Sequence, residues 1–332
     1  MDTGCIPPTV NFFQYTSGYS AYQKFVVQSL GERMKTNKTL SMKRTLLFLA
    51  SCFFMSMSFI QAQVPRIVGA EGMPVDTVPK RVEDYTKRRF FYKVSFVKDT
   101  TRRDKETQAQ CVLEIGQRGS CFKDFYEYAA DSVNDAVARK KGTAMEIFSK
   151  AYDYVKKTQW RTPVLKGYPS GQDYHQYGDP IVGSYEYGCP SPSFDWQIGE
   201  ETKEIMGYTC RKATCHHSGR DYTAWYAEDI ALSDGPYIFR GLPGLIVAIG
   251  SDDGEYAFEL NGMQEITFPS PIYFKKNAFT KVGSREEMRK TIRNIHEHYA
   301  EVVANSPAFV NSPIPVDFSH LPPQPFNPLE KE

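Results

Sequence analysis

The alternation of apolar and polar positions is clearest between residues 245 and 260. Residues 245–249 (LIVAI) form an apolar run without a polar interruption, which predicts a strand covered on both faces. In residues 256–260, Tyr, Phe and Leu alternate with Ala and Glu, which predicts a strand with one face on the core. The sequence Asp-Asp-Gly at 252–254 predicts a tight hairpin between them. We expect the strand at 245–249 to be the centre of the core.

Upstream, the same pattern predicts further strands at 90–97 and 107–115. The period then changes to three and four residues, which predicts helices at 124–137 and 142–157. A last amphipathic helix is expected over 284–303, with Ser284 as its N-cap and Glu287 completing a capping box. This order predicts an α+β fold: a curved antiparallel sheet, open like a half-barrel, with helices packed on one face.

The N-terminal part shows the features of an export signal. Residues 42–62 begin with Met-Lys-Arg and continue as an apolar stretch, which resembles a secretory signal peptide cleaved after Ala62. The apolar stretch would span only about 24 Å as a helix, less than the bilayer core, so no transmembrane span is expected. A lipoprotein anchored at Cys52 is the alternative. Residues 1–41 show no clear period, and we expect translation to begin at Met34 or Met42.

The remaining boundaries follow from proline, glycine and periodicity. Residues 63–85 are expected to form a flexible lead-in, residues 86–310 a single α+β domain, and the proline-rich residues 311–332 an extended tail. The chain has 332 residues, 41% of them hydrophobic, so it can bury a substantial core. Its net charge of +1 gives no reason to expect nucleic-acid binding.

A distinctive signature lies within residues 206–266. Its centre is the turn Gly241, Leu242, Pro243 and Gly244, for which we predict a type II turn with a positive φ at Gly244. Together with GRDYTAWY at 219–226, this run resembles the GLPGLI family of exported bacterial proteins. That resemblance implies an envelope location but no reaction, cofactor or substrate. A curled, unclosed sheet is also similar, at the level of fold only, to LolA-type lipoprotein carriers, which favours a hydrophobic cavity.

Aromatic and basic side chains around the signature are the candidates for ligand or partner binding, although core packing would also explain the aromatic ones. The alternative for the arginines is a surface ion pair. These candidates are Trp196, Tyr222, Trp225, Tyr226, Tyr237, Phe239, Arg220 and Arg240.

Cysteine and histidine residues offer two further candidates. Cys111 and Cys121, on neighbouring predicted strands, are the expected disulfide pair, with buried free thiols as the alternative. Cys215, His216 and His217 are a weak candidate for metal binding, because adjacent strand residues point to opposite faces. We therefore expect no metal centre there and no cofactor.

These observations favour an exported protein, periplasmic or associated with the outer membrane. Its expected role is non-enzymatic: binding or carrying an apolar small molecule, or contacting another envelope protein, through the surface around the signature strand. A structural component of an envelope machine is the first alternative, and a periplasmic hydrolase or redox enzyme is the second.

Overall fold

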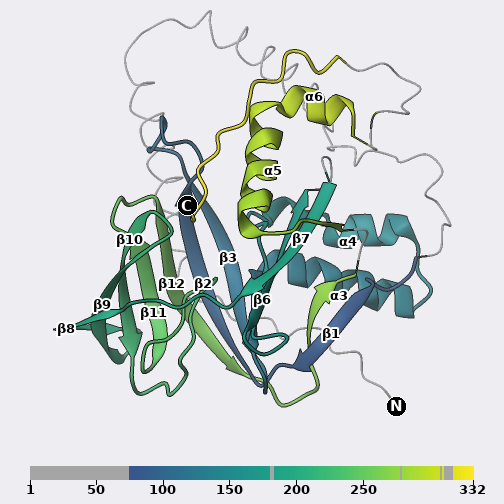
Figure 1. The fold of residues 1–332 in the computed structure, drawn as a ribbon. Helices are drawn as coiled ribbons and strands as arrows, with labels where there is room; N and C mark the ends of the chain where they lie inside the picture. The colour runs from purple at the N-terminus through teal and green to yellow at the C-terminus, as the bar shows by residue number, and fades with distance from the viewer. Residues whose placement is uncertain (1–74, 180–182, 277–278, 307–308, 310–316) are drawn as a thin grey trace, which may run out of the picture. The chain divides into compact units, whose positions relative to one another are not determined.

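The computed structural model describes residues 75–179, 183–276, 279–306, 309 and 317–332. Figure 1 shows the arrangement of the elements. The strands are β1 (Lys80–Tyr85), β2 (Arg88–Val97), β3 (Glu106–Ile115), β4 (Ser120–Asp124), β5 (Val164–Lys166), β6 (Gln172–Asp179), β7 (Gly183–Pro190), β8 (Gln197–Ile205), β9 (Tyr208–His217), β10 (Arg220–Ala227), β11 (Leu245–Ser251), β12 (Tyr256–Glu265), β13 (Pro271–Lys275) and β14 (Thr280–Lys281). The helices are α3 (Phe125–Arg139), α4 (Ala144–Lys157), α5 (Arg285–Glu297) and α6 (Tyr299–Ala304).

Twelve of these strands form one sheet in the order β14-β7-β6-β5-β4-β3-β2-β12-β11-β10-β9-β8. The neighbours are antiparallel except β14 and β7, which pair in parallel. The end strands β14 and β8 do not pair with each other, so the sheet is unclosed. Strands β1 and β13 form a separate two-stranded ribbon. The predicted α+β fold with a large unclosed antiparallel sheet is confirmed.

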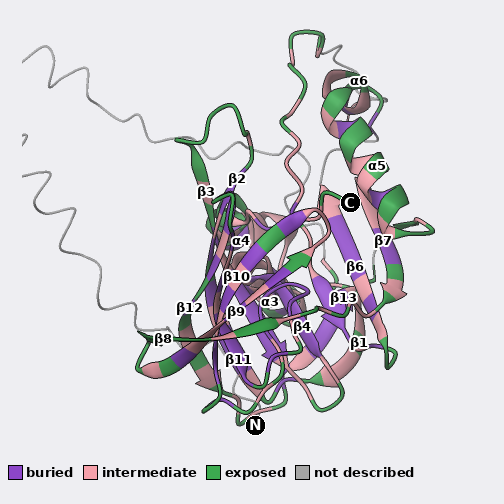
Figure 2. Ribbon diagram, turned by 60° about the vertical axis from the view of Figure 1, so that its left-hand side comes forward, coloured by how far each residue is buried: buried purple, intermediate pink, exposed green. Residues whose placement is uncertain are grey.

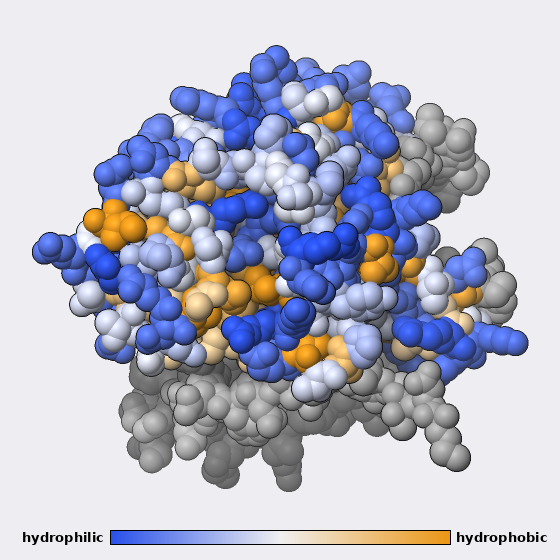
Figure 3. Space-filling view, turned by 60° about the horizontal axis from the view of Figure 1, so that its bottom comes forward, coloured by the Kyte–Doolittle hydropathy of each residue, from blue (hydrophilic) through white to orange (hydrophobic). Residues whose placement is uncertain are grey.

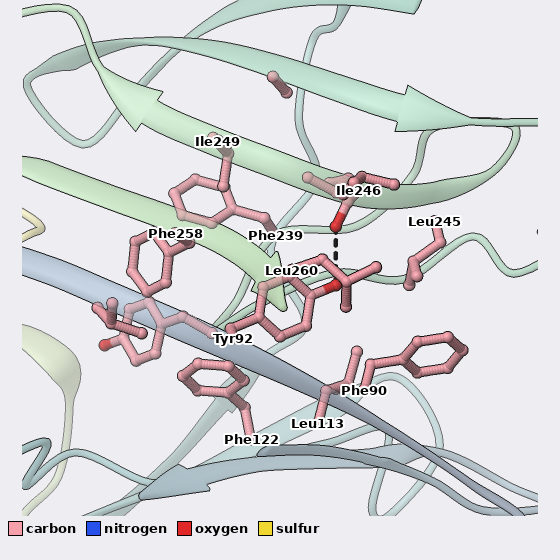
Figure 4. Packing of buried hydrophobic residues seen from close by; sticks show 14 of the residues in the cluster. Phe90, Tyr92, Leu113, Phe122, Phe239, Leu245, Ile246, Ile249, Phe258 and Leu260 are labelled. Carbon is pink, nitrogen blue, oxygen red and sulfur yellow. Dashed lines mark hydrogen bonds between the residues drawn. The ribbon is translucent and has the colours of Figure 1, made fainter. Parts of the chain in front are cut away.

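The sheet curls around its main hydrophobic core. Strands β4 and β12 have two strands between them, so in a flat sheet they would lie about 14 Å apart. The rings of Phe122 on β4 and Phe258 on β12 are nevertheless only 6.1 Å apart. In Figure 4, the aromatic rings of Phe122, Tyr92 and Phe258 face one another across this interior, and the Tyr92 hydroxyl donates to the Ile246 carbonyl at 2.7 Å.

The helices cover both faces of the sheet, whereas the sequence led us to expect one. On the outer face, Phe125 of α3 packs edge-on against Phe91 of β2, with ring centroids 5.6 Å apart. On the inner face, Met288 of α5 packs with Tyr177 and Tyr187 of β6 and β7. Every residue of β4, which Figure 2 colours as buried, and of β5 is buried, so each side of the sheet needs its own apolar cover there.

A long connection between β10 and β11, residues 228–244, folds across the inner face, and we call it the crossing loop. Its buried apolar side chains join the main core. The Lys166 ammonium group of β5 pairs with Asp234 and donates to the Gly235 carbonyl at 2.7 Å. Arg240 pairs with Asp173 of β6. The crossing loop therefore ties the signature strand β11 to strands that lie well away from it in the sheet order.

The signature turn differs from the prediction. Gly241 has the positive φ, +95°, while Gly244 is not in the left-handed region. A side chain at Gly244 would instead overlap the carbonyl oxygen of Ala227, because the backbone of β10 runs directly against it. The prediction of a type II turn with positive φ at Gly244 was therefore wrong, although both positions require glycine.

Two further predictions need correction, and the predictions for residues 1–62 lie outside the described residues. Part of the predicted lead-in is strand β1, which pairs with β13. The C-terminal segment, residues 317–332, is not a free tail, since Leu329 is buried in the main core. Its prolines prevent regular strand pairing but not docking. In the part of the chain that the structure describes, no helix is long and apolar enough to cross a membrane.

The predicted helices are confirmed, with two differences in the last one. The Ser284 hydroxyl accepts from the Glu287 amide at 3.1 Å and caps α5. The Glu287 carboxylate returns to the Gly283 amide at 2.6 Å and not to Ser284. The helix also stops at Glu297 and resumes as α6. Local sequence signals were sufficient to locate these elements.

Candidate functional site

A cavity of about 380 Å³ lies between the inner face of the sheet, α5 and residues 324–330 of the C-terminal segment. Figure 1 shows the C-terminal segment passing beside α5. The volume falls within the range of small-molecule pockets. Six aromatic side chains form much of its wall: Phe96, Trp160, Tyr177, Tyr187, Tyr237 and Tyr256.

Trp160 follows the end of helix α4 and is held in this wall by Asp124, the N-cap residue of α3. The carboxylate of Asp124, which caps α3, also accepts hydrogen bonds from the backbone amides of Gln159 and Trp160, at 2.9 and 3.0 Å. The indole ring then makes edge contacts with Phe96 at 5.9 Å and Tyr237 at 5.4 Å. One buried carboxylate thus fixes both the outer helix and a ring of the inner cavity.

Helix α5 supplies the opposite wall. Met288, Ile292 and Ile295 recur at steps of four and three residues, so they share one helical face. That face lines the cavity, together with the side chains of Arg285 and Arg289 one turn apart. The apolar stripe that holds α5 to the protein therefore also faces the open space.

The C-terminal segment is fixed to the sheet by Arg220 of β10. The buried guanidinium group donates to the carbonyl oxygens of Leu329 and Pro328, both at 2.9 Å, and to the Asn327 side chain at 2.7 Å. Asn327 in turn donates to the Val97 carbonyl at 2.8 Å. These bonds hold the backbone of the segment as the third wall of the cavity.

Arg220 is buried, not a surface residue, and it has acidic partners. It pairs with Asp253 and, at 2.8 Å, with Glu255. Burial alone would raise the pKa of Asp253. Hydrogen bonds from Ser251 and from the Glu255 amide, with Arg220 beside it, lower that pKa to about 2. A buried arginine requires such compensation, because leaving its charge unpaired would cost several kcal/mol (~3–5 for a broken pair).

Glu330 joins the C-terminal segment to the other two walls. One carboxylate oxygen accepts from Arg285 of α5 at 2.6 Å, and the other accepts from the Tyr237 hydroxyl at 3.3 Å. Burial, and then the nearby Glu330, raise the pKa of Tyr237 well above its usual value, so the hydroxyl keeps its proton and donates. Tyr237 also has a left-handed backbone, with φ of +49°.

His175 completes the inner wall next to Tyr187. The two rings stack, with centroids 4.7 Å apart. Burial lowers the pKa of His175, so its imidazole is neutral at pH 7. It contributes a flat and uncharged surface to the cavity.

Of the aromatic residues that the sequence suggested, Tyr237 lines the cavity and the others lie elsewhere. Tyr222 donates to the Leu329 carbonyl at 3.0 Å and contacts Phe239, with ring centroids 4.9 Å apart. Tyr226 is buried and bonds to Glu228. Core packing therefore accounts for Tyr222, Tyr226 and Phe239.

The two remaining tryptophans and Arg240 also lie outside the cavity lining. The Trp196 indole donates to the Arg240 carbonyl at 2.8 Å and so supports the crossing loop. Trp225 is on the outer face of β10, where the ammonium groups of Lys203 and Lys212 lie 5.6 and 5.9 Å from its ring. Arg240 itself is engaged with Asp173.

Cys111 and Cys121 are free thiols, so the predicted disulfide is wrong. In the β3–β4 ladder, Cys121 is opposite Glu114, three residues from Cys111. An offset of three places the two sulfur atoms on opposite faces of the sheet. Cys111 accordingly joins the inner core, and Cys121 packs under β13.

The Cys215-His216-His217 run does not form a shared site. Cys215 is buried, while His216 is exposed beside Asp221, with Nδ1 and Oδ1 2.7 Å apart. His217 packs against the Phe194 ring at 4.5 Å. Among the described residues, no group of side chains is arranged to hold a metal ion.

Apart from Tyr237, the side chains that line the cavity were not among the residues predicted from the sequence. The stripe of apolar residues on α5 was a usable signal, but its partner surface was not identifiable. Trp160, Arg220 and Leu329 come together from positions distant in the chain. No local pattern indicates that a proline-rich segment returns to the core.

The sequence comparison matches only a short part of the chain to a known family. Residues 216–248, which include all of β10, the crossing loop and part of β11, match a family model described as a protein of unknown function (Porph_ging). No curated protein matches the sequence.

Two solved structures show a distant likeness. The structure of PNGF-II in a P21 space group aligns with a TM-score of 0.41 and 13% identity, over 62% of this chain and 33% of that chain. The structure of PNGF-II in a C2 space group gives 0.39 and 13%, over 62% and 32%. This chain thus spans about a third of the length of those chains. The cavity and the anchored C-terminal segment are therefore interpreted from their own contacts.

Proposed function

We propose that this chain is an exported envelope protein of the GLPGLI type that binds a small molecule with an apolar body in the cavity beneath α5. The observation that carries the proposal is the cavity itself, about 380 Å³ and walled by aromatic rings. Protein interiors are close-packed and rarely contain voids much larger than a water molecule. A space of this size between a sheet and a helix is suited to a ligand.

The enclosing elements support ligand binding. The sheet side of the cavity belongs to the main core through Phe96 and Trp160. The opposite side consists of α5, which packs on Tyr177 and Tyr187 through Met288, and of residues 324–330, which Arg220 holds to the sheet. Both sides are therefore positioned by the fold, as expected for a largely preformed ligand site.

The alternative roles receive less support. A component of an envelope assembly would be expected to offer an open, apolar sheet edge, but β8 is largely exposed and carries Glu200, Glu201, Lys203 and Glu204, charges that discourage strand pairing. On the face shown in Figure 3, apolar side chains lie in small groups among hydrophilic ones. An enzyme would need reactive groups in the cavity, and there the acidic residues Asp179 and Glu330 are engaged with arginines.

Binding of a neutral apolar dye tests this proposal. N-phenyl-1-naphthylamine, which fluoresces in apolar surroundings, should bind the full chain saturably. Ile292→Trp fills the cavity from α5 and should weaken dye affinity by about tenfold or more, since the added ring occupies the ligand's volume. Fluorescence titration measures the dye affinity of the unmodified chain and of the variant.

Val155→Trp provides the matched control, because Val155 is exposed on α4 and does not line the cavity. This variant should bind the dye as the unmodified chain does. Native mass spectrometry of the purified chain, followed by a denatured measurement, would reveal a co-purified ligand. Absence of saturable dye binding, or equal binding by the Ile292→Trp variant, would contradict the proposal.

A further inference from the structure

The cavity has an excess of positive charge. Four cationic side chains line it, and they are Lys98, Arg161, Arg285 and Arg289. The acidic side chains in the lining are Asp179 and Glu330. Asp179 pairs with Arg161 at 3.3 Å and Glu330 with Arg285 at 2.6 Å. The formal charges of Lys98 and Arg289 are left without an acidic counterpart in the lining.

Arg289 is the more informative of these two cations. Its Nη1 atom is buried and has no hydrogen-bond partner among the described residues. Leaving such a donor unsatisfied is unfavourable, since a buried charged group loses its water without replacement. Arg285 lies one turn away on the same helical face, so the two like charges also repel each other.

Glu330, the acidic side chain of the C-terminal segment in the lining, is engaged with other groups, and the exposed Glu286 pairs with Lys290. Glu330 uses one carboxylate oxygen for Arg285 and the other for the Tyr237 hydroxyl. Lys98, in contrast, is exposed and donates to Gln159 at 3.1 Å. Arg289 thus lines the cavity with a half-buried guanidinium group whose hydrogen bonds the protein's own described side chains do not complete.

We propose that the ligand is an amphipathic anion, whose acidic head group is bound by Arg289 and whose apolar body lies against the aromatic wall; this inference rests on the proposed function. A planar guanidinium group matches the oxygens of a carboxylate, phosphate or sulfonate and forms strong charge-assisted hydrogen bonds with them. Lys98 adds attraction at the exposed side of the cavity. A cavity that combines aromatic rings with unbalanced cations fits a ligand that has an apolar body and an acidic head group.

Two dyes with the same aromatic body separate the head group from the apolar part. 8-Anilino-1-naphthalenesulfonate carries a sulfonate, and N-phenyl-1-naphthylamine does not. Arg289→Gln should weaken binding of the sulfonate dye by about tenfold or more, because a charge-assisted bond is lost. Binding of the neutral dye should change less than about twofold. Fluorescence titration of both dyes gives the change in each affinity between the unmodified chain and the variant.

Lys290→Gln is the matched control, since Lys290 is the next residue of α5, is exposed and pairs with Glu286. It should leave both affinities unchanged. Competition by decanoate and by decyl phosphate then distinguishes a carboxylate from a phosphate head group.

The outcomes separate this inference from the proposed function. Saturable binding of the neutral dye, with Arg289→Gln affecting both dyes equally or neither, would overturn the anionic head group and leave the binding function standing. Equally effective displacement of the sulfonate dye by 1-decanol, decanoate and decyl phosphate would also overturn the anionic head group. If neither dye binds saturably, the proposed function fails and the inference fails with it.

Discussion

Two glycines of the crossing loop are required for different physical reasons. Gly241 has a φ of +95°, which side chains rarely allow, but the nearest atoms to an added Cβ there are those of Trp196 at ordinary contact distance. Gly244 is outside the left-handed region but has no room, because the carbonyl of Ala227 occupies the place of a Cβ. One position is limited by conformation, and the other by close backbone approach.

Alanine substitutions should therefore differ in cost. Gly241→Ala should lower the free energy of unfolding by about 1–2 kcal/mol, the cost of a left-handed residue. Gly244→Ala should lower it by about 3 kcal/mol or more, because the backbones of β10 and the crossing loop must move apart. Urea denaturation at pH 7 measures both changes. Equal costs, or the reverse order, would refute this explanation of the two glycines.

His175 should make the protein less stable in mild acid. Burial lowers its pKa in the folded state, so the unfolded chain, with a value of about 6.5, binds the proton more readily. Below about pH 6.5 the unfolded state takes up more protons, and stability falls as the pH falls. His175→Phe, which keeps a flat ring against Tyr187, should reduce this loss between about pH 7 and pH 5.

Urea denaturation at several pH values compares the two proteins. His217 also has a pKa lowered by burial, so the variant should retain part of the acid sensitivity. The quantity to examine is thus the difference between the two proteins at each pH. A difference that does not change with pH would mean that His175 is not protonated more easily on unfolding.

At the scale of elements, the C-terminal segment behaves as part of the fold although residues 317–332 form neither helix nor strand. The segment is held by Leu329, which is buried in the main core, and by Arg220, whose guanidinium group donates hydrogen bonds to three of its oxygen atoms. An extended segment with prolines has few backbone donors to place in a sheet. Side-chain donors from the sheet replace the missing ladder.

Leu329→Ala should lower the free energy of unfolding by about 2–5 kcal/mol, the usual range for a buried leucine. The deletion leaves a space next to Tyr222 and Arg220, which the anchored backbone cannot readily fill. Chemical denaturation monitored by tryptophan fluorescence measures the change. Leu321→Ala, at a half-buried position of the same segment, is the control and should cost clearly less. Similar small effects at both positions would show that the segment is only loosely docked.

The sequence was informative wherever neighbours along the chain determine the structure. The hairpin of β11 and β12, helices α3 and α4, and the Ser284 cap all follow from short-range pattern. The order of the elements also predicted a curved, unclosed sheet. The two-sided placement of the helices and the docking of Leu329 do not follow from short-range pattern. Arg220 and Leu329 are 109 positions apart, and no periodicity links them. The candidate site was therefore predicted as an aromatic cavity in kind, but Tyr237 alone among the named aromatics lines it.

At the scale of the whole described domain, polar ties complement the apolar core. The crossing loop connects β11 to β5 and β6 through Lys166–Asp234 and Arg240–Asp173. The C-terminal segment connects the crossing loop to α5 through Glu330, which accepts from Tyr237 and Arg285. Both connections span the inner face, where an unclosed sheet lacks the strand pairing that would hold its two halves together. The ties thus fix the curvature that creates the cavity.

The anchoring of Asn327 to Val97 has a consequence for the order of events during biosynthesis. Residues 327–329 leave the ribosome after every strand of the sheet, yet they complete the core and supply the acceptors for buried Arg220. A growing chain therefore has a full set of strands while its core is still open and one buried charge lacks its carbonyl partners. Completion of the fold therefore waits until residues 327–329 are available, and apolar surface of the core stays exposed until then.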